Sequence, residues 1–338
     1  MEMKNNDESI RLILIQAPAD VLYALQLMEL YKTSRLILYV LNVHNVFKML
    51  QILNLKHCEI YFIPYPDFNL RSLRKILNTK RRLKEIWKNN FSHLYERMDY
   101  LHFFSRYEDP LASYIITKCI RMKSGLQIIY NNHYDPQHVS PSFVGSIKSL
   151  VNNFIMHLIT DAKYELVDVK YPEFKVRAYK RIDVNPMQYS TNVVKKYKIK
   201  FNDSKSVLFL LNPLFANSDK DEICLDIVSK IVVEFKKRGY ITYIKGHPRM
   251  GCSEEYRKLM DKELECYILS ELIDYDSFEY VIGADSTAVA HAALERKSKT
   301  YSILDMIHCY NYDLVKNHLL EQSKGYLNFI TNINDLFE

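Results

Sequence analysis

Short apolar runs alternate with amphipathic stretches along the whole chain, and this alternation constrains the fold more than any other feature. Short strands that alternate with helical patterns indicate βαβ units and parallel sheets. The expected fold class is therefore α/β. The strands are expected at 12–15, 36–40, 60–63, 100–104 and 126–129 in the N-terminal half, and at 207–211, 241–244, 266–269, 280–282 and 300–303 in the C-terminal half.

The length of 338 residues favours two domains, each large enough to bury its own core. The strand pattern predicts two Rossmann-like halves that face each other across a central cleft. We expect an N-terminal domain at 1–180, a linker at 181–205 and a C-terminal domain at 206–338. The connecting region, 169–205, is rich in Lys, Tyr and Asn and contains Pro172 and Pro186.

Glycine and cysteine usage excludes several classes of protein. None of the 7 glycines forms a Gly-x-Gly-x-x-Gly or Gly-Lys-Ser/Thr loop, which argues against a dinucleotide fingerprint and a P-loop. The 6 cysteines contain no Cys-x-x-Cys pair, and no secretory signal precedes the first strand, so we expect a reducing cytoplasm. No apolar run approaches the ~20 residues of a membrane span. The sequence thus predicts a cytoplasmic protein, either soluble or peripheral at the inner face of the plasma membrane.

A His-Pro pair, His247-Pro248, directly follows one of the expected strands. In strand–helix–strand units, ligands collect outside the carboxyl ends of the strands. An imidazole there, with Lys245 and Arg249 beside it, fits a site that binds a nucleotide phosphate and stabilises it as a leaving group. The alternative is a surface loop in which Pro248 only ends the strand.

A second polar turn, Asp285-Ser286-Thr287, stands between the next expected strand and the helix-forming run 288–294. A helix start offers unpaired backbone N–H groups and the positive end of the helix dipole, so Ser286 and Thr287 could bind phosphate there. The alternative is ordinary helix capping by Asp285 or Ser286.

The order of these motifs resembles that of bacterial GT-B sialyltransferases, in particular the lipooligosaccharide sialyltransferase and polysialyltransferase families. Those enzymes also have a His-Pro pair, then a helix and a strand, then a Ser-Ser or Ser-Thr pair that opens a helix. Residues 12–25, which include Pro18, are similar to the first strand, Pro-containing turn and first helix of those enzymes.

The resemblance implies an inverting glycosyltransferase that needs neither metal nor cofactor. Its donor would be CMP-sialic acid or a related nonulosonic acid, and its acceptor a terminal sugar of a cell-surface glycan such as lipooligosaccharide or capsule. The N-terminal domain would bind the acceptor and the C-terminal domain the CMP-sugar. His247, Ser286 and Thr287 would stabilise the leaving phosphate, with Lys245 or Arg249 adding positive potential.

The chain departs from those families at the general base. They carry an acidic pair followed by Gly, where this chain has Asn131, Asn132 and His133. The nearest groups that could accept a proton from the acceptor hydroxyl are Asp135 and His133. Asp135 is equally typical of a turn before proline. Further candidates for the base are Asp161 and Glu165.

A strongly basic segment, 71–88, holds a single acid, Glu85, among eight Lys and Arg residues interleaved with apolar ones. It indicates a basic amphipathic helix or helix pair. Such a helix would suit an anionic membrane surface, an acidic donor or acceptor, or a solvated face. Nucleic acid is not expected, because a net charge of +6 on 338 residues is modest and no recognition motif accompanies it. A homodimer is compatible with the sequence.

Three alternatives to sialyl transfer stay open. Asp285-Ser286-Thr287 also resembles the turn of CDP-glycerol-type glycerophosphotransferases, and CMP-Kdo transferases share a similar pair of turns. The missing acidic pair favours a third alternative, an inactive nucleotide-sugar-binding subunit.

Overall fold

The computed structural model divides into two compact units, Met1–Val193 and Val194–Glu338, referred to below as unit one and unit two. The structure describes residues 9–64, 72–104, 109–122, 125–132, 154–155, 157–160, 164–165, 177–178, 182–186, 189–211, 221–247, 251–308 and 311–337.

Unit one is built on a six-stranded parallel sheet with the order β3-β2-β1-β4-β5-β8. The first strand lies in the interior, and the chain winds outward first to one side and then to the other, as in a doubly wound Rossmann-like fold. The strands are β1 (Ile10–Ile15), β2 (Arg35–Leu41), β3 (Cys58–Ile63), β4 (Tyr100–Phe103), β5 (Gln127–Asn132) and β8 (Ile182–Pro186).

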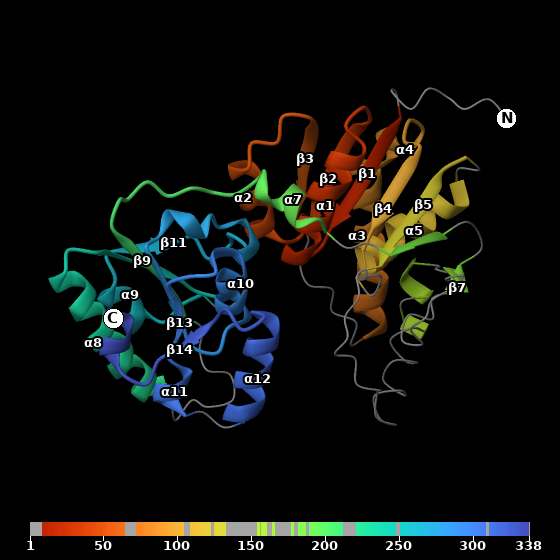
Figure 1. Ribbon diagram of the computed structural model, residues 1–338. Coiled ribbons are helices and arrows are strands. Elements are labelled where there is room, and N and C mark those ends of the chain that lie inside the picture. The colour runs from red at the N-terminus through yellow and green to blue at the C-terminus, as the bar shows by residue number, and fades with distance from the viewer. Residues whose placement is uncertain are drawn as a thin grey trace. The chain divides into compact units, whose positions relative to one another are not determined.

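Both faces of this sheet are buried, because Leu12, Ile13, Leu14 and Ile15 of β1 are all inaccessible to solvent. Near-continuous apolar runs of this kind are typical of parallel strands covered by helices on both sides. The helices are α1 (Pro18–Leu30), α2 (His44–Ile52), α3 (Leu73–Asn90), α4 (Ser92–Tyr95) and α5 (Pro110–Met122) (Figure 1). A short antiparallel pair joins β6 (Tyr164–Glu165) and β7 (Arg177–Ala178).

Unit two repeats the same winding in the order β11-β10-β9-β12-β13-β14, again with all strands parallel. Its strands are β9 (Ser206–Leu210), β10 (Ile241–Lys245), β11 (Lys262–Leu264), β12 (Tyr280–Gly283), β13 (Thr300–Ser302) and β14 (Asn328–Phe329). Its helices are α7 (Thr191–Lys195, which crosses the boundary), α8 (Asp221–Lys237), α9 (Glu254–Leu259), α10 (Thr287–Arg296), α11 (Leu304–Ile307) and α12 (Tyr312–Gln322). Single 3₁₀ turns lie at Ser270–Leu272, Tyr275–Ser277 and Ile333–Leu336.

The α/β class and the two Rossmann-like halves expected from the sequence are confirmed by these two sheets. The expectation of a strand at 266–269 is wrong, since the third strand of unit two is β11 and 266–269 form the turn that leads into a 3₁₀ helix. The segment is apolar because Ile268 and Leu269 are buried in the core without pairing to the sheet. Within the range expected as a linker, the structure has β8, which pairs with β5 as the outer strand of unit one.

Candidate functional site

Two predicted motifs lie at the same edge, the carboxyl edge, of the sheet in unit two. The His247 turn follows β10, the Ser286 turn follows β12, and both strands pair directly with β9. Since neighbouring strands lie about 4.8 Å apart, the two turns begin roughly 10 Å from each other across the end of β9. The winding reverses between β9 and β12, and ligands of open α/β sheets bind at such a reversal.

The loop after β10 is closed on itself. The backbone N–H of His247 donates to the carbonyl of Gly251 (2.9 Å), and the N–H of Gly251 donates to the carbonyl of His247 (2.8 Å). Gly246 is packed so tightly that a Cβ there would lie 2.4 Å from the carbonyl carbon of Gly251. Gly251 has φ +69°, in the left-handed region that glycine adopts at little cost. The half-buried His247 is therefore held on a fixed backbone; Pro248 and Arg249 lie outside the described residues.

Lys245, the last residue of β10, is buried, with 4% of its surface exposed. Its Nζ donates to the carbonyl of Gly246 (3.1 Å). Burial lowers the pKa of the ammonium to about 8, an effect that Glu271 and Cys266 nearby partly oppose. Lys245 thus supports the closed loop from the sheet side and places a positive charge next to it.

The turn after β12 is a helix start, as predicted. Ser286 is the N-cap of α10, and its Oγ accepts a hydrogen bond from the backbone N–H of Ala288 (3.2 Å). Thr287 is the first helical residue and is exposed. Capping by Ser286 is therefore real, and the Thr287 hydroxyl stands at the positive end of the helix dipole.

Neighbouring groups fix this turn. Ser302 on β13 is buried and donates its hydroxyl to the carbonyl of Ala284 (2.6 Å). Burial raises the pKa of Asp285, and the nearby carboxylate of Asp221 raises it further. Asp221 is the first residue of α8, which follows β9, so the N-terminus of α8 also lies close to this turn. An ionised Asp285 would repel a phosphate, so a hydroxyl group of this turn is a better phosphate ligand than the Asp285 carboxylate.

Gly246 and Gly251 determine the shape of this loop, and sequence reasoning missed them. The signal was present as two glycines that bracket the His-Pro pair, in the run Gly246-His-Pro-Arg-Met-Gly251. Ser302 gave no such signal, because its contact with Ala284 joins neighbouring strands that no local pattern relates.

In unit one, Pro18 is the first residue of α1, immediately beyond the carboxyl end of β1. The carboxylate of Asp20 accepts hydrogen bonds from the backbone N–H groups of Gln16 (2.8 Å) and Ala17 (2.9 Å), which fixes the entry into the helix. Pro18 thus has the position that a proline with no N–H to donate occupies most easily.

Asn131, one of the residues at the family's acidic positions, is fully buried within β5. Its Nδ2 donates to the carbonyl of Phe103 (3.3 Å) and lies 3.5 Å from Nδ1 of His102. Asn131 is consequently part of the sheet's interior. The predicted proton acceptors, Asp135 and His133, lie outside the described residues.

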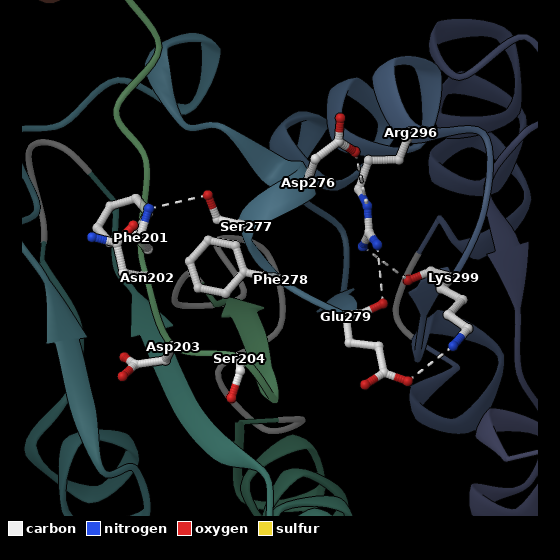
Figure 2. Close-up of a pocket in the computed structure, with 10 residues that line it drawn as sticks. All are labelled: Phe201, Asn202, Asp203, Ser204, Asp276, Ser277, Phe278, Glu279, Arg296 and Lys299. Atoms are coloured by element: carbon white, nitrogen blue, oxygen red, sulfur yellow. Dashed lines mark hydrogen bonds and ion pairs between the residues drawn. The ribbon is translucent and has the colours of Figure 1, made fainter.

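The hollow drawn in Figure 2 belongs to the opposite edge of the sheet in unit two. It has a volume of about 550 Å³, and three of its lining residues, Ser204, Glu279 and Lys299, precede β9, β12 and β13. Arg296 crosses it, donating from Nη2 to the carbonyl of Glu279 (3.0 Å), while Nε lies 3.9 Å from a carboxylate oxygen of Asp276. The hollow lies at the amino edge of the sheet, where the contacts of Arg296 join its walls. The two motif turns lie at the opposite, carboxyl edge.

Among the residues that the structure describes, no group of three or more His, Cys, Asp or Glu side chains is placed to hold a metal ion. No described helix has the length and apolar character of a membrane span.

No family model matches the chain, and no curated protein matches it by sequence. Solved structures with a similar arrangement include UDP-GlcNAc 2-epimerase from Methanocaldococcus jannaschii, with 11% identity, coverage of 97% of this chain and 90% of that one, and a TM-score of 0.49. UDP-GlcNAc 2-epimerase from Neisseria meningitidis bound to UDP-GlcNAc has 11% identity, coverage of 97% of both chains and a TM-score of 0.43. MurG from Acinetobacter baumannii has 11% identity, coverage of 96% and 88%, and a TM-score of 0.35. Similarity at this level transfers neither an activity nor a substrate to this chain.

Proposed function

We propose that the chain is a glycosyltransferase that uses a nucleotide-activated sugar and holds the nucleotide phosphate at the carboxyl edge of unit two. One observation supports this most strongly. The His247 turn and the Ser286 turn end β10 and β12, the two strands that flank β9, so both motifs serve one edge of one sheet. The two turns begin roughly 10 Å apart, so side chains from both can reach one phosphate that lies between them.

The proposed chemistry is displacement at the anomeric carbon. The acceptor hydroxyl oxygen forms the new bond, and the bond from the anomeric carbon to the phosphate oxygen breaks on the opposite face. The nucleotide leaves with the electron pair, and the hydroxyl proton passes to a base on the protein. Inversion of the anomeric centre follows from this geometry.

Negative charge grows on the departing phosphate, so fixed donors aimed at it lower the barrier. His247 provides a ring on a closed loop, and the start of α10 provides the Thr287 hydroxyl and the helix dipole. The buried ammonium of Lys245 adds positive potential behind the loop. These groups are positioned before substrate binds, which is what such stabilisation requires.

The proposed donor is CMP-sialic acid or a related nonulosonic acid, and the proposed acceptor is the terminal sugar of a cell-surface glycan. Support for this finer assignment comes from the motif resemblance, namely the His-Pro pair and the Ser-Thr pair in the same order. Asp285 beside Ser286 and Thr287 keeps CDP-glycerol as the second candidate donor, since its glycerol hydroxyls suit a carboxyl group.

The proposed base lies in unit one after β5. Asn131 is excluded by its buried position and its hydrogen bond to Phe103, and Asn132 has an amide, which does not accept a proton at neutral pH. Asp135 is the first carboxylate after the strand, and His133 is the alternative.

A donor screen tests the proposal. Purified protein is incubated with CMP-sialic acid, CMP-Kdo or CDP-glycerol and a mixed pool of terminal glycans, and released CMP is measured. We expect acceptor-dependent release from CMP-sialic acid. Saturable CMP binding without release from any donor would instead indicate a nucleotide-sugar-binding subunit. Absence of CMP binding would contradict the proposed CMP-linked and CDP-linked donors.

A further inference from the structure

The outward face of α3 is basic along its whole length. Arg74, Leu77, Arg81, Lys84 and Lys88 follow one another at alternating spacings of three and four residues, which places them on one stripe, and all are exposed. Lys75 and Arg82 extend the stripe on its flank. The only acid between 74 and 88 is Glu85, whose carboxylate lies 4.0 Å from Nε of Arg81 in a solvent-exposed pair. The face therefore keeps a strong positive charge.

The inward face of α3 is buried in the core of unit one. Leu83 is inaccessible to solvent, Thr79 is 4% exposed and Trp87 is 7% exposed. The indole of Trp87 stacks on Phe91 with ring centroids 5.8 Å apart. Because this apolar face is already part of the core of unit one, α3 cannot turn it toward another surface without losing those core contacts.

Apolar side chains are nevertheless exposed beside the basic stripe. Leu77 on the stripe itself is 59% exposed. Nζ of Lys80, one turn further along, donates to the carbonyl of Leu158 (3.2 Å), so a second segment lies against this flank of α3. That segment exposes 63% of Phe154 and 41% of Leu158. Positive charge and isolated apolar anchors thus share one surface.

This combination fits the headgroup layer of an anionic bilayer. Cations are attracted by the negative surface potential, and large apolar side chains enter the boundary between headgroups and acyl chains. A polynucleotide would be attracted by the same charges, but it has little apolar surface that an exposed leucine could contact. We propose that the α3 surface, comprising Arg74, Leu77, Arg81, Lys84 and Lys88 with Phe154 and Leu158, docks unit one on an anionic lipid bilayer while α3 stays packed.

Vesicle sedimentation tests the docking. The wild-type protein is expected to bind vesicles that contain phosphatidylglycerol, not pure phosphatidylcholine vesicles, and to be released by salt. The triple variant Arg74→Gln, Arg81→Gln, Lys88→Gln should bind the anionic vesicles about 100-fold more weakly, since each lost charge costs about 5-fold. Leu77→Ser should weaken binding about 5-fold by removing an anchor.

A matched control carries the same change in net charge elsewhere. Lys230→Gln, Lys237→Gln and Lys258→Gln alter exposed residues on α8 and α9 of unit two. This control should bind anionic vesicles as the wild-type protein does, and both triple variants should keep wild-type CMP affinity. Equal weakening of vesicle binding by the two triple variants would contradict a defined surface. Preference for a single-stranded polynucleotide over anionic vesicles would overturn the choice of partner.

Trp87, the only tryptophan of the chain, reports whether α3 stays packed. Brominated phospholipids quench a tryptophan that enters the acyl region. We expect vesicle binding without quenching, because Trp87 faces the core. Quenching on binding would show that α3 inserts its apolar face and would contradict docking of the folded unit.

Discussion

His247 and Gly251 are joined by two backbone hydrogen bonds of 2.9 and 2.8 Å that close the loop after β10. The loop leaves the sheet at Gly246 and comes back beside it at Gly251, five residues later. The backbone position from which the His247 side chain projects is therefore fixed at the carboxyl edge of the sheet. Closure depends on Gly246, because any Cβ there would meet backbone atoms of Gly251, which cannot move aside as a flexible side chain would.

Gly246→Ala should therefore open the loop and displace His247. We expect CMP affinity to fall at least 10-fold, while unit two still unfolds cooperatively in a thermal melt. Gly125→Ala is the matched control, since nothing lies within 4 Å of a Cβ at that position and its φ is ordinary. Wild-type CMP affinity in Gly246→Ala would show that the closed loop has no part in the donor site.

Variants at Ser286 and Thr287 distinguish helix capping from ligand binding. Ser286→Ala removes the N-cap and should cost about 1 kcal/mol of stability, whereas the exposed Thr287→Ala should not. Each hydroxyl should contribute 1–2 kcal/mol to binding of a charged ligand, or roughly 5- to 30-fold in CMP affinity. The double variant should bind CMP more weakly than either single one. An unchanged CMP affinity in the double variant, measured by calorimetry, would leave only the capping role.

Asp135→Asn should abolish transfer and leave CMP binding intact, because we place the donor site in unit two. His133→Ala should have a smaller effect. A carboxylate base would give a rate that falls only in acid, whereas a histidine base would place the inflection near 6.5. Should the two variants behave the other way round, His133 is the base. If both remain fully active, the base lies elsewhere.

His102 should make unit one sensitive to acid. It is inaccessible to solvent on β4, with Nε2 at 3.4 Å from Nη1 of Arg11, and the rings of Tyr31 and Tyr100 sandwich that guanidinium at 3.6 Å each. Burial, and then the charge of Arg11, lowers the pKa of His102 from 6.5 to about 3. Between these values the unfolded chain holds a proton that the folded chain does not. Stability is therefore lost as the pH falls below 6.5, by about 1.4 kcal/mol per pH unit.

Urea unfolding followed by Trp87 fluorescence measures this effect, because Trp87 lies in unit one. Between pH 6.5 and 5 the free energy of unfolding should fall by about 2 kcal/mol more in the wild-type protein than in His102→Gln. The exposed His93→Gln is the control and should behave as the wild-type protein. An identical pH dependence in His102→Gln would mean that another group titrates.

Much of the fold followed from the sequence because buried parallel strands are apolar on both faces. Runs such as 12–15 and 207–211 could have few other structures, and both are interior strands. The prediction of a strand at 266–269 was wrong for a physical reason. It is as apolar as a strand, but Ile268 and Leu269 reach the core from a turn. β8 was missed because two residues of its sequence, Ile-Asp-Val-Asn-Pro, are polar, as is possible in an outer strand.

The site was predictable where local sequence sets local geometry. A polar turn before an alanine-rich run starts a helix, so Ser286 was recognisable as an N-cap. The burial of Lys245 was not predictable, because a lysine at a strand end faces solvent or core according to what packs around it, and here Glu271 and Cys266 from a later segment lie nearby. The pairing of Ser302 with Ala284 likewise depends on the packing of neighbouring strands.

Calorimetric titration of CMP and of cytidine into the full chain and into His247→Ala tests the central claim most directly. The claim is that the His247 loop binds and stabilises the nucleotide phosphate. The wild-type protein should bind CMP clearly more tightly than cytidine, and His247→Ala should narrow that difference while leaving cytidine binding unchanged. In the transfer reaction the same variant should lose about two orders of magnitude in turnover. Equal affinity of the wild-type protein for CMP and cytidine, or a folded His247→Ala variant with wild-type CMP affinity and turnover, would contradict the account.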